Sequence, residues 1–166
     1  SSAAAGKDAS IILLEEAGIF PNLQEVYSIT QPTLEDGDVI TGMMVIFGTG
    51  GTKGANWETL EKMFYNPTAY NAVTFNNVWD ENQSGYGCGF FHSYLQNLKP
   101  YVDDAGNSDF VSAKIANDSK IENKKNTERD ADLINQYIGQ RCTSPSEGFS
   151  RTGDNLFSSK ELDDHI

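Results

Sequence analysis

The chain contains little cysteine, little histidine and no long apolar run. Cys88 and Cys142 are far apart and lack metal-ligand spacing, so we expect free thiols. His92 and His165 have no partner at helical spacing, which argues against a metal site on either. The runs "IILL" and "MMVIF" are far shorter than the ~20 residues that cross a bilayer, and the alanine-rich start lacks the parts of a signal sequence. We therefore expect a cytosolic protein with no membrane partner.

Basic residues are also scarce. The chain has 12 lysines and arginines and 24 acidic residues, which gives a formal charge of −12. The summed field of such a chain repels nucleic acid and anionic membranes, so if it handles DNA, other parts must hold the DNA. The 166 residues, 38% of them hydrophobic, fit one ordinary globular domain.

The first fifty residues have the pattern of a parallel βαβ unit. Residues 8–14 form an apolar run without alternation, as in a strand that is buried on both faces. Helical spacing follows from Leu23, and Pro32 should end or kink that helix at Gln31. A turn at "EDGD" leads to a second strand, predicted over 39–47, and then to a glycine cluster. Ligands on such sheets bind at the carboxyl ends of the strands.

The rest of the chain is less regular. A helix is predicted over "NWETLEKMFYNP" with Asn56 as its N-cap, and "AVTFNNVWD" and "GCGFFHSYL" could be two further strands. Residues 103–132 are polar and charged, which indicates either an exposed helix or a mobile insertion with a solvated surface. A last helix is expected in "DADLINQYIGQ". We therefore expect one domain over 1–141 and a linker over 142–166.

Two adjacent acids, Glu15 and Glu16, end the first predicted strand. In nucleotide hydrolases, one acid at such a position holds Mg²⁺ through its water shell and the next polarises the attacking water. Mg²⁺ keeps several waters, so one carboxylate with phosphate oxygens can hold it. The alternative is that both glutamates begin a solvated loop.

Several segments together resemble a known family. These are "IILLEEAGIFPN", "GMMVIFGTGGTKGANWETLEKMFYNP", "FNNVWDE", "CGFF" and "SPSEGFSRTGDNLF". In that order they resemble the large terminase subunit of tailed bacteriophages, the ATPase and nuclease that packages viral DNA. The resemblance covers residues 9–157. It implies part of a RecA-like P-loop NTPase, an α/β fold with a mostly parallel sheet and flanking helices, here without its P-loop strand.

The resemblance also implies roles for individual residues. Residues 11–16 would be the Walker B strand, with Glu15 as the metal and cofactor residue and Glu16 as the catalytic base. Thr49 would be catalytic in the coupling motif. Neighbouring parallel strands end at similar heights, so its hydroxyl could reach Glu16 or the γ-phosphate, directly or through one water. Gly48 and Gly50 would contact the nucleotide. The family often has Asp where this chain has Glu15, and Ser or Thr where it has glycines. An ordinary turn capped by Thr49 is the alternative for that loop.

A phosphate-binding loop is missing from the pattern. The Gly6-Lys7 pair lacks the first loop glycine, has Asp8 where Ser or Thr should follow, and leaves no room for a helix. The resemblance thus implies a piece of the motor that is incomplete as an ATPase by itself, with its nuclease domain beyond Ile166.

The whole protein would use Mg²⁺ and ATP and act on duplex DNA with a portal protein and a small terminase subunit. It would form a ring homo-oligomer in the host cytoplasm, transiently docked on the prohead. Two alternatives remain open: an acidic, non-catalytic phage structural or interaction domain, and another Mg²⁺-dependent phosphoryl-transfer enzyme. A "GxxxxGK[ST]" pattern upstream of Ser1 would favour the ATPase.

Overall fold

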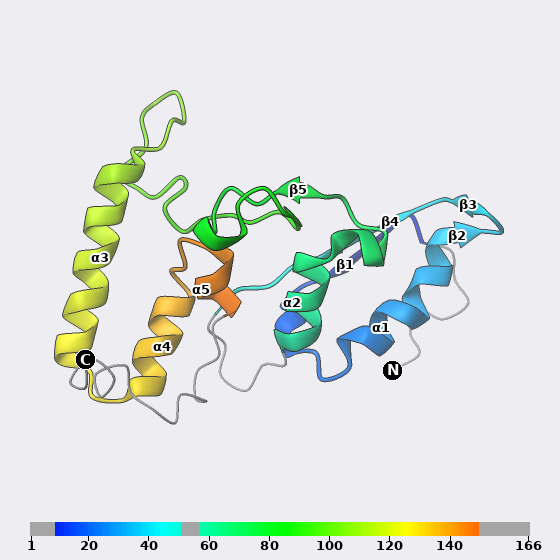
Figure 1. The fold of residues 1–166 in the computed structure, drawn as a ribbon, viewed down its shortest axis with the longest axis horizontal. Coiled ribbons are helices and arrows are strands. Elements are labelled where there is room, and N and C mark those ends of the chain that lie inside the picture. Colours follow the sequence, from blue (N-terminus) through cyan, green and yellow to red (C-terminus); the bar gives the residue numbers. More distant parts are fainter. Residues whose placement is uncertain (1–8, 51–56, 150–166) are drawn as a thin grey trace.

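The structure is a computed structural model that describes residues 9–50 and 57–149. Its described part is elongated: the helix α3 (Phe110–Thr127) lies at one end and the short strands β2 (Glu35–Asp36) and β3 (Val39–Ile40) lie at the other (Figure 1). Gly6, Lys7, the expected N-cap Asn56 and residues 150–166 of the expected linker lie outside the described residues.

A parallel pair of strands forms the centre of the first half. β1 (Ile11–Leu14) pairs with β4 (Met43–Ile46), and the register runs from Ile11 beside Met43 to Leu14 beside Ile46. The connection contains the 3-10 turn η1 (Ala17–Ile19), helix α1 (Leu23–Thr30) and the 3-10 turn η2 (Gln31–Leu34). Pro32 lies in η2, directly after α1 ends, because its ring cannot continue an α-helix. The predicted parallel βαβ unit is confirmed.

The second predicted strand is divided, which corrects the continuous strand expected over 39–47. Its first two residues form β3, which pairs antiparallel with β2 in a hairpin. The amide groups of Thr41 and Gly42 both donate to the Leu34 carbonyl, at 2.8 and 3.1 Å. Gly42 also passes so close to the Ala9 carbonyl that a Cβ atom would collide with it. These contacts redirect the chain into β4.

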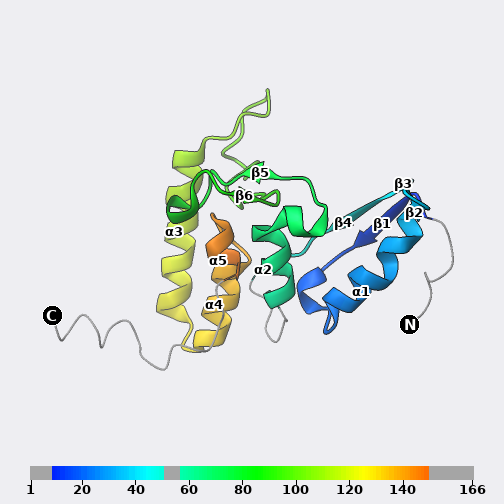
Figure 2. The ribbon, with the colours of Figure 1, turned by 45° about the vertical axis from the view of Figure 1, so that its right-hand side comes forward.

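One face of the β1–β4 pair carries the core. Helix α2 (Trp57–Tyr65) and the 3-10 turn η3 (Pro67–Tyr70) follow β4 in the chain, and α2 packs beside α1 (Figure 2). The buried apolar cluster joins strand, turn and helices, and it consists of Leu14, Ala17, Leu23, Leu60 and Met63. The even-numbered side chains of β1 and β4 therefore face the helices.

The two further strands are much shorter than predicted and do not join the parallel pair. β5 (Phe75–Asn76) and β6 (Gly87–Cys88) form a separate antiparallel pair, with the 3-10 turn η4 (Glu81–Gln83) between them. Asn77 is the physical reason, because its side-chain oxygen accepts the amides of Trp79 and Asp80 and turns the chain. The fold is thus mixed helix and strand with a small parallel sheet, which is consistent with the expected α/β class.

The C-terminal third of the described chain is helical. The polar stretch forms α3, capped by the Asp109 side chain, and Asp130 caps α4 (Ala131–Gly139). A short helix α5 (Pro145–Phe149) lies where a linker was expected, and its Phe149 ring contacts Trp57, Phe64 and Tyr65. Residues 142–149 therefore pack into the fold rather than leave it. Both cysteines are free. None of the described helices is long and apolar enough to span a membrane.

Candidate functional site

The candidate site begins where β1 ends. Glu16 has φ 51° and ψ 43°, a left-handed backbone conformation that residues other than glycine rarely adopt. This turn separates the two acids: Glu15 is exposed, whereas Glu16 is half-buried. The adjacent carboxylates therefore have different surroundings, as a division of roles between them requires.

Thr49 contacts Glu16 across the two strand ends. The Thr49 hydroxyl donates to Glu16 Oε1 at 3.0 Å, and the Thr49 amide donates to Glu16 Oε2 at 3.3 Å. Both carboxylate oxygens thus accept from one residue that is 33 positions away in the chain. The sequence-based expectation that this hydroxyl reaches the second acid is confirmed as a contact.

Backbone hydrogen bonds hold the two strand ends at the same height. The Phe47 amide donates to the Leu14 carbonyl at 3.0 Å, and the Ala17 amide donates to the Phe47 carbonyl at 2.9 Å. Gly48 then lies against the Ala17 backbone, where a Cβ atom would be only 3.3 Å from the Ala17 nitrogen. The pairing therefore continues past the strands and places Thr49 beside Glu16.

Glu15 is exposed at the end of β1. Within the described residues it makes no hydrogen bond or ion pair. The described part of the chain also holds no group of three or more acidic, histidine or cysteine side chains that could bind a metal directly. One carboxylate can still hold Mg²⁺ when waters and phosphate oxygens complete its six ligands. The exposed Glu15 carboxylate fits such a water-mediated site.

Gly50 lies against the C-terminal helices rather than against the acids. A Cβ atom on Gly50 would lie 2.7 Å from the Gly139 carbonyl oxygen and 3.0 Å from the Gly148 Cα atom. The loop after β4 thus contacts Glu16 through Thr49 and contacts α4 and α5 through the next residue. Of the two glycines predicted to contact the nucleotide, Gly48 lies beside the acids and Gly50 lies at this helix contact.

Sequence reasoning missed Asp80, a buried acid that connects α2 to α5. Asp80 is 6% exposed and accepts hydrogen bonds from the Tyr65 hydroxyl, the Asn77 amide group and the Ser146 backbone amide, at 3.0, 3.0 and 3.1 Å. Burial by itself raises the pKa of Asp80, but the bonds from Asn77, Ser146 and Tyr65 outweigh it, and the pKa is lowered.

Burial and the hydrogen bond to Asp80 raise the pKa of Tyr65, so this tyrosine stays neutral. The network joins α2, the turn after β5 and α5. The segments "NNVWD" and "SPSEG" carry its residues, but no spacing rule connects them in the sequence.

Comparison with protein-family models, with curated proteins and with solved structures gave no match.

Proposed function

We propose that this chain is part of a RecA-like motor ATPase that packages duplex DNA into a viral prohead, as a segment of a large terminase subunit. The contact between Glu16 and Thr49 at the carboxyl ends of two parallel strands carries the proposal. The sequence resemblance implies this pair of motifs, and ligands on parallel sheets bind at this edge.

Each side chain has a distinct task in this proposal. Glu16 accepts a proton from the attacking water, and its position is held by the two bonds from Thr49. Glu15, exposed beside it, would hold Mg²⁺ through water, and the ion would offset the negative charge of the ATP phosphates. The described residues include no phosphate-binding loop, so the chain would act together with a segment that supplies one.

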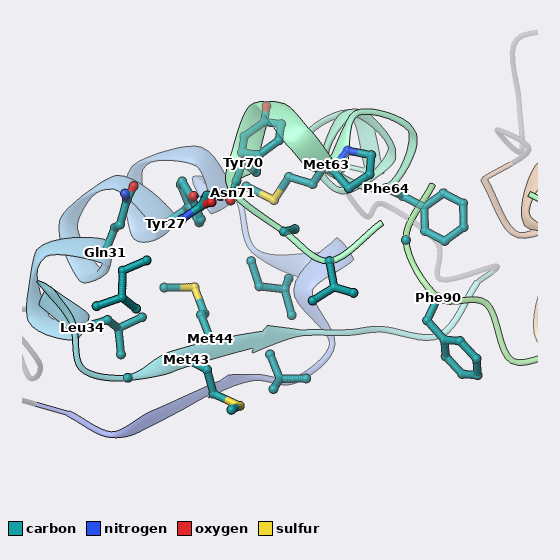
Figure 3. A pocket seen from close by; sticks show the side chains of 18 of the residues that line it. Tyr27, Gln31, Leu34, Met43, Met44, Met63, Phe64, Tyr70, Asn71 and Phe90 are labelled. Carbon is teal, nitrogen blue, oxygen red and sulfur yellow. Dashed lines mark hydrogen bonds between the residues drawn. The ribbon is translucent and has the colours of Figure 1, made fainter. Parts of the chain in front are cut away.

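The second face of the parallel pair is apolar and exposed. In Figure 3 the Met44 side chain points toward the helices, whereas Met43 points to this second face. The odd-numbered side chains Ile11, Leu13, Met43 and Val45 are 61%, 62%, 59% and 41% exposed. Parallel sheets are normally covered on both faces, so an exposed apolar face indicates that further structure packs there. The same face also favours a second candidate, a non-catalytic interaction domain.

The test uses the intact packaging motor that contains this chain. Glu16→Gln keeps the size of the side chain but removes the base, so we expect ATP binding to persist while hydrolysis falls by about two to four orders of magnitude. Glu15→Gln should instead raise the Mg²⁺ concentration needed for half-maximal rate. Glu25→Gln, an exposed glutamate on α1, is the matched control and should change neither.

Two results would contradict the proposal. Unchanged hydrolysis in Glu16→Gln would exclude Glu16 as the base and favour the interaction domain. Micromolar binding of Mg-ATP by the isolated chain, measured by calorimetry, would also argue against it, because a domain of charge −12 with no described phosphate loop should bind an anionic nucleotide very weakly.

A further inference from the structure

Helix α3 is stabilised by interactions within its own 18 residues. It stands at one end of the described chain, with α4 beside it (Figure 1, Figure 2). The Asp109 side chain caps its first turn by accepting the Ser112 amide at 3.1 Å. Ion pairs between residues three or four positions apart then run along it: Lys114 with Asp118, Lys125 with Glu122 and Lys124 with Glu128. The helix therefore needs little support from its neighbours to stay helical.

The packing of α3 against the rest of the protein is weak. Its buried residues are Ala113 and Asn117, at 0% and 1% exposed. The large apolar side chains near its start, Phe110, Val111 and Ile115, are all more than half exposed. Most helices in proteins are held in place by burial of an apolar face. One buried alanine contributes little of this stabilisation.

Asn117 opposes the docked position of α3. Both polar atoms of its side-chain amide are buried, and neither has a hydrogen-bond partner in the described chain. A buried amide without a partner is costly, because water would satisfy the same atoms if they were exposed. The burial of Asn117 therefore favours the helix that has moved away from its neighbours.

The contact between α3 and α4 also brings two cations together. Lys124 of α3 lies 6.0 Å from the centre of the Tyr137 ring, at the outer limit of a cation–π contact. The Arg141 guanidinium stacks on the same ring at 3.6 Å. Glu128 pairs with Lys124, but Arg141 makes no ion pair with any described residue. Two positive charges near one ring repel each other, so this contact adds little to the docking of α3.

We propose that α3 detaches from α4 as an intact helix and docks again, and that the unpartnered amide of Asn117 keeps the detached state populated. A helix that holds its own shape and buries an unpartnered amide loses little when it leaves its place. Since α4 ends at Gly139, against which Gly50 packs, the helix that α3 leaves is the one that supports the loop of Thr49. The movement needs no nucleotide and does not depend on the proposed ATPase.

Thiol labelling of the whole chain measures the detachment. Ala113→Cys places a small thiol on the buried face of α3, where a labelling reagent reaches it when the helix moves away. The chain without this substitution gives the background from Cys88, which is buried, and from Cys142, whose pKa burial raises to about 11. All further variants carry Ala113→Cys, and the measured quantity is the labelling rate at this position.

Two variants test the role of Asn117. Asn117→Leu removes the unpartnered amide and keeps a side chain branched at the same atom, so labelling should slow at least tenfold. Asn117→Ala removes the amide without adding volume, so labelling should slow here too. Asn123→Leu, on the exposed face of α3, is the matched control, because it changes helix propensity in the same way. It should leave the labelling rate unchanged.

Amide exchange shows whether α3 stays helical when it detaches. The Ile121 amide lies in the middle of α3, so it should be protected from exchange at least tenfold more than the thiol of Ala113→Cys is protected from labelling. Equal protection of the two groups would show that α3 unfolds, and this result would overturn the proposal. Labelling that is no slower than wild type in both Asn117 variants would overturn it as well, because the amide would then not favour detachment.

Discussion

Glu16 combines a strained backbone with a well-held side chain. A left-handed conformation costs an ordinary L-residue about 1–2 kcal/mol. Here the flanking backbone bonds and the two bonds from Thr49 hold it, and the conformation turns the carboxylate toward the neighbouring strand end. Strain of this kind gathers at functional sites, where neighbouring structure determines the geometry.

Under the proposed motor function, a substitution at Thr49 tests coupling. Thr49→Val keeps the shape but removes the hydroxyl that donates to Glu16 Oε1. Because Thr49 also belongs to a loop that contacts α4 and α5, we expect ATP affinity within a few-fold of wild type but a much larger loss of DNA packaging than of ATP hydrolysis. Packaging and hydrolysis rates would be measured on the same preparation with proheads and DNA.

The matched control for this substitution is Thr41→Val. The exposed Thr41 hydroxyl donates to the Leu34 carbonyl at 3.1 Å, outside the candidate site. It should leave the ratio of packaging to hydrolysis unchanged. Equal losses of both rates in Thr49→Val would indicate a catalytic or folding defect, and wild-type packaging would remove Thr49 from the mechanism.

At the scale of elements, the turn η1 is held between β1 and α2 by close packing. Ala17 is fully buried, and the Trp57 ring lies directly over Gly18, where a Cβ atom would overlap it. The segment "EEAG" therefore needs a small residue at its fourth position, because the first residue of α2 covers it. This contact connects the acid pair to the helix that follows the glycine loop.

Gly18→Ala should destabilise the protein by about 1–3 kcal/mol, the usual cost of overpacking. The reason is that the Trp57 ring must move, together with the Phe149 ring that it meets edge-on at 6.2 Å. Urea unfolding monitored by circular dichroism measures the change. In a Trp57→Leu background the same substitution should cost less, and an equal cost in both backgrounds would show that the ring is not the cause.

At the scale of the whole molecule, Asp80 connects three segments that are distant in sequence. Its lowered pKa means that the folded state favours the carboxylate. The stabilisation is therefore present above the ordinary value of 3.8 and is lost as the pH falls through the lowered pKa of the folded state.

The contribution of Tyr65 to stability depends on pH in the opposite direction. Its raised pKa stabilises the fold below its ordinary value of 10.0, and that contribution is lost as the pH rises through the raised pKa.

Asp80→Asn should lower the free energy of unfolding by about 1–3 kcal/mol at neutral pH, because a buried donor then loses its acceptor. The difference from wild type should shrink below pH 3.8, where the unfolded wild-type acid binds a proton. Urea unfolding across a series of pH values measures both effects.

Asp118→Asn is the control for Asp80→Asn, because Asp118 forms an exposed pair with Lys114 on α3. It should change stability by no more than about 0.5 kcal/mol. A loss in Asp80→Asn that is equally large at every pH would show that the charge of Asp80 does not stabilise the fold.

The parallel pair and the contact between Glu16 and Thr49 could be predicted because their signals are local. An apolar run followed by two acids marks β1, and a second apolar run followed by glycines marks β4. The helices at α1, α2 and α4 were also predicted, and the polar stretch forms α3, one of its two expected alternatives. The division of residues 39–47 was missed, since it depends on Leu34 and Ala9 rather than on the strand itself.

The sequence by itself determined the charge of −12, the adjacent acids, the parallel strand–helix–strand unit and the helices α2 and α4, because composition and periodicity are properties of neighbouring residues. Only the tertiary structure decided the left-handed turn at Glu16, the buried network around Asp80, the docking of Phe149 and the burial of Asn117. Each of these depends on contacts between residues that are distant in the chain, and local sequence patterns do not predict such contacts.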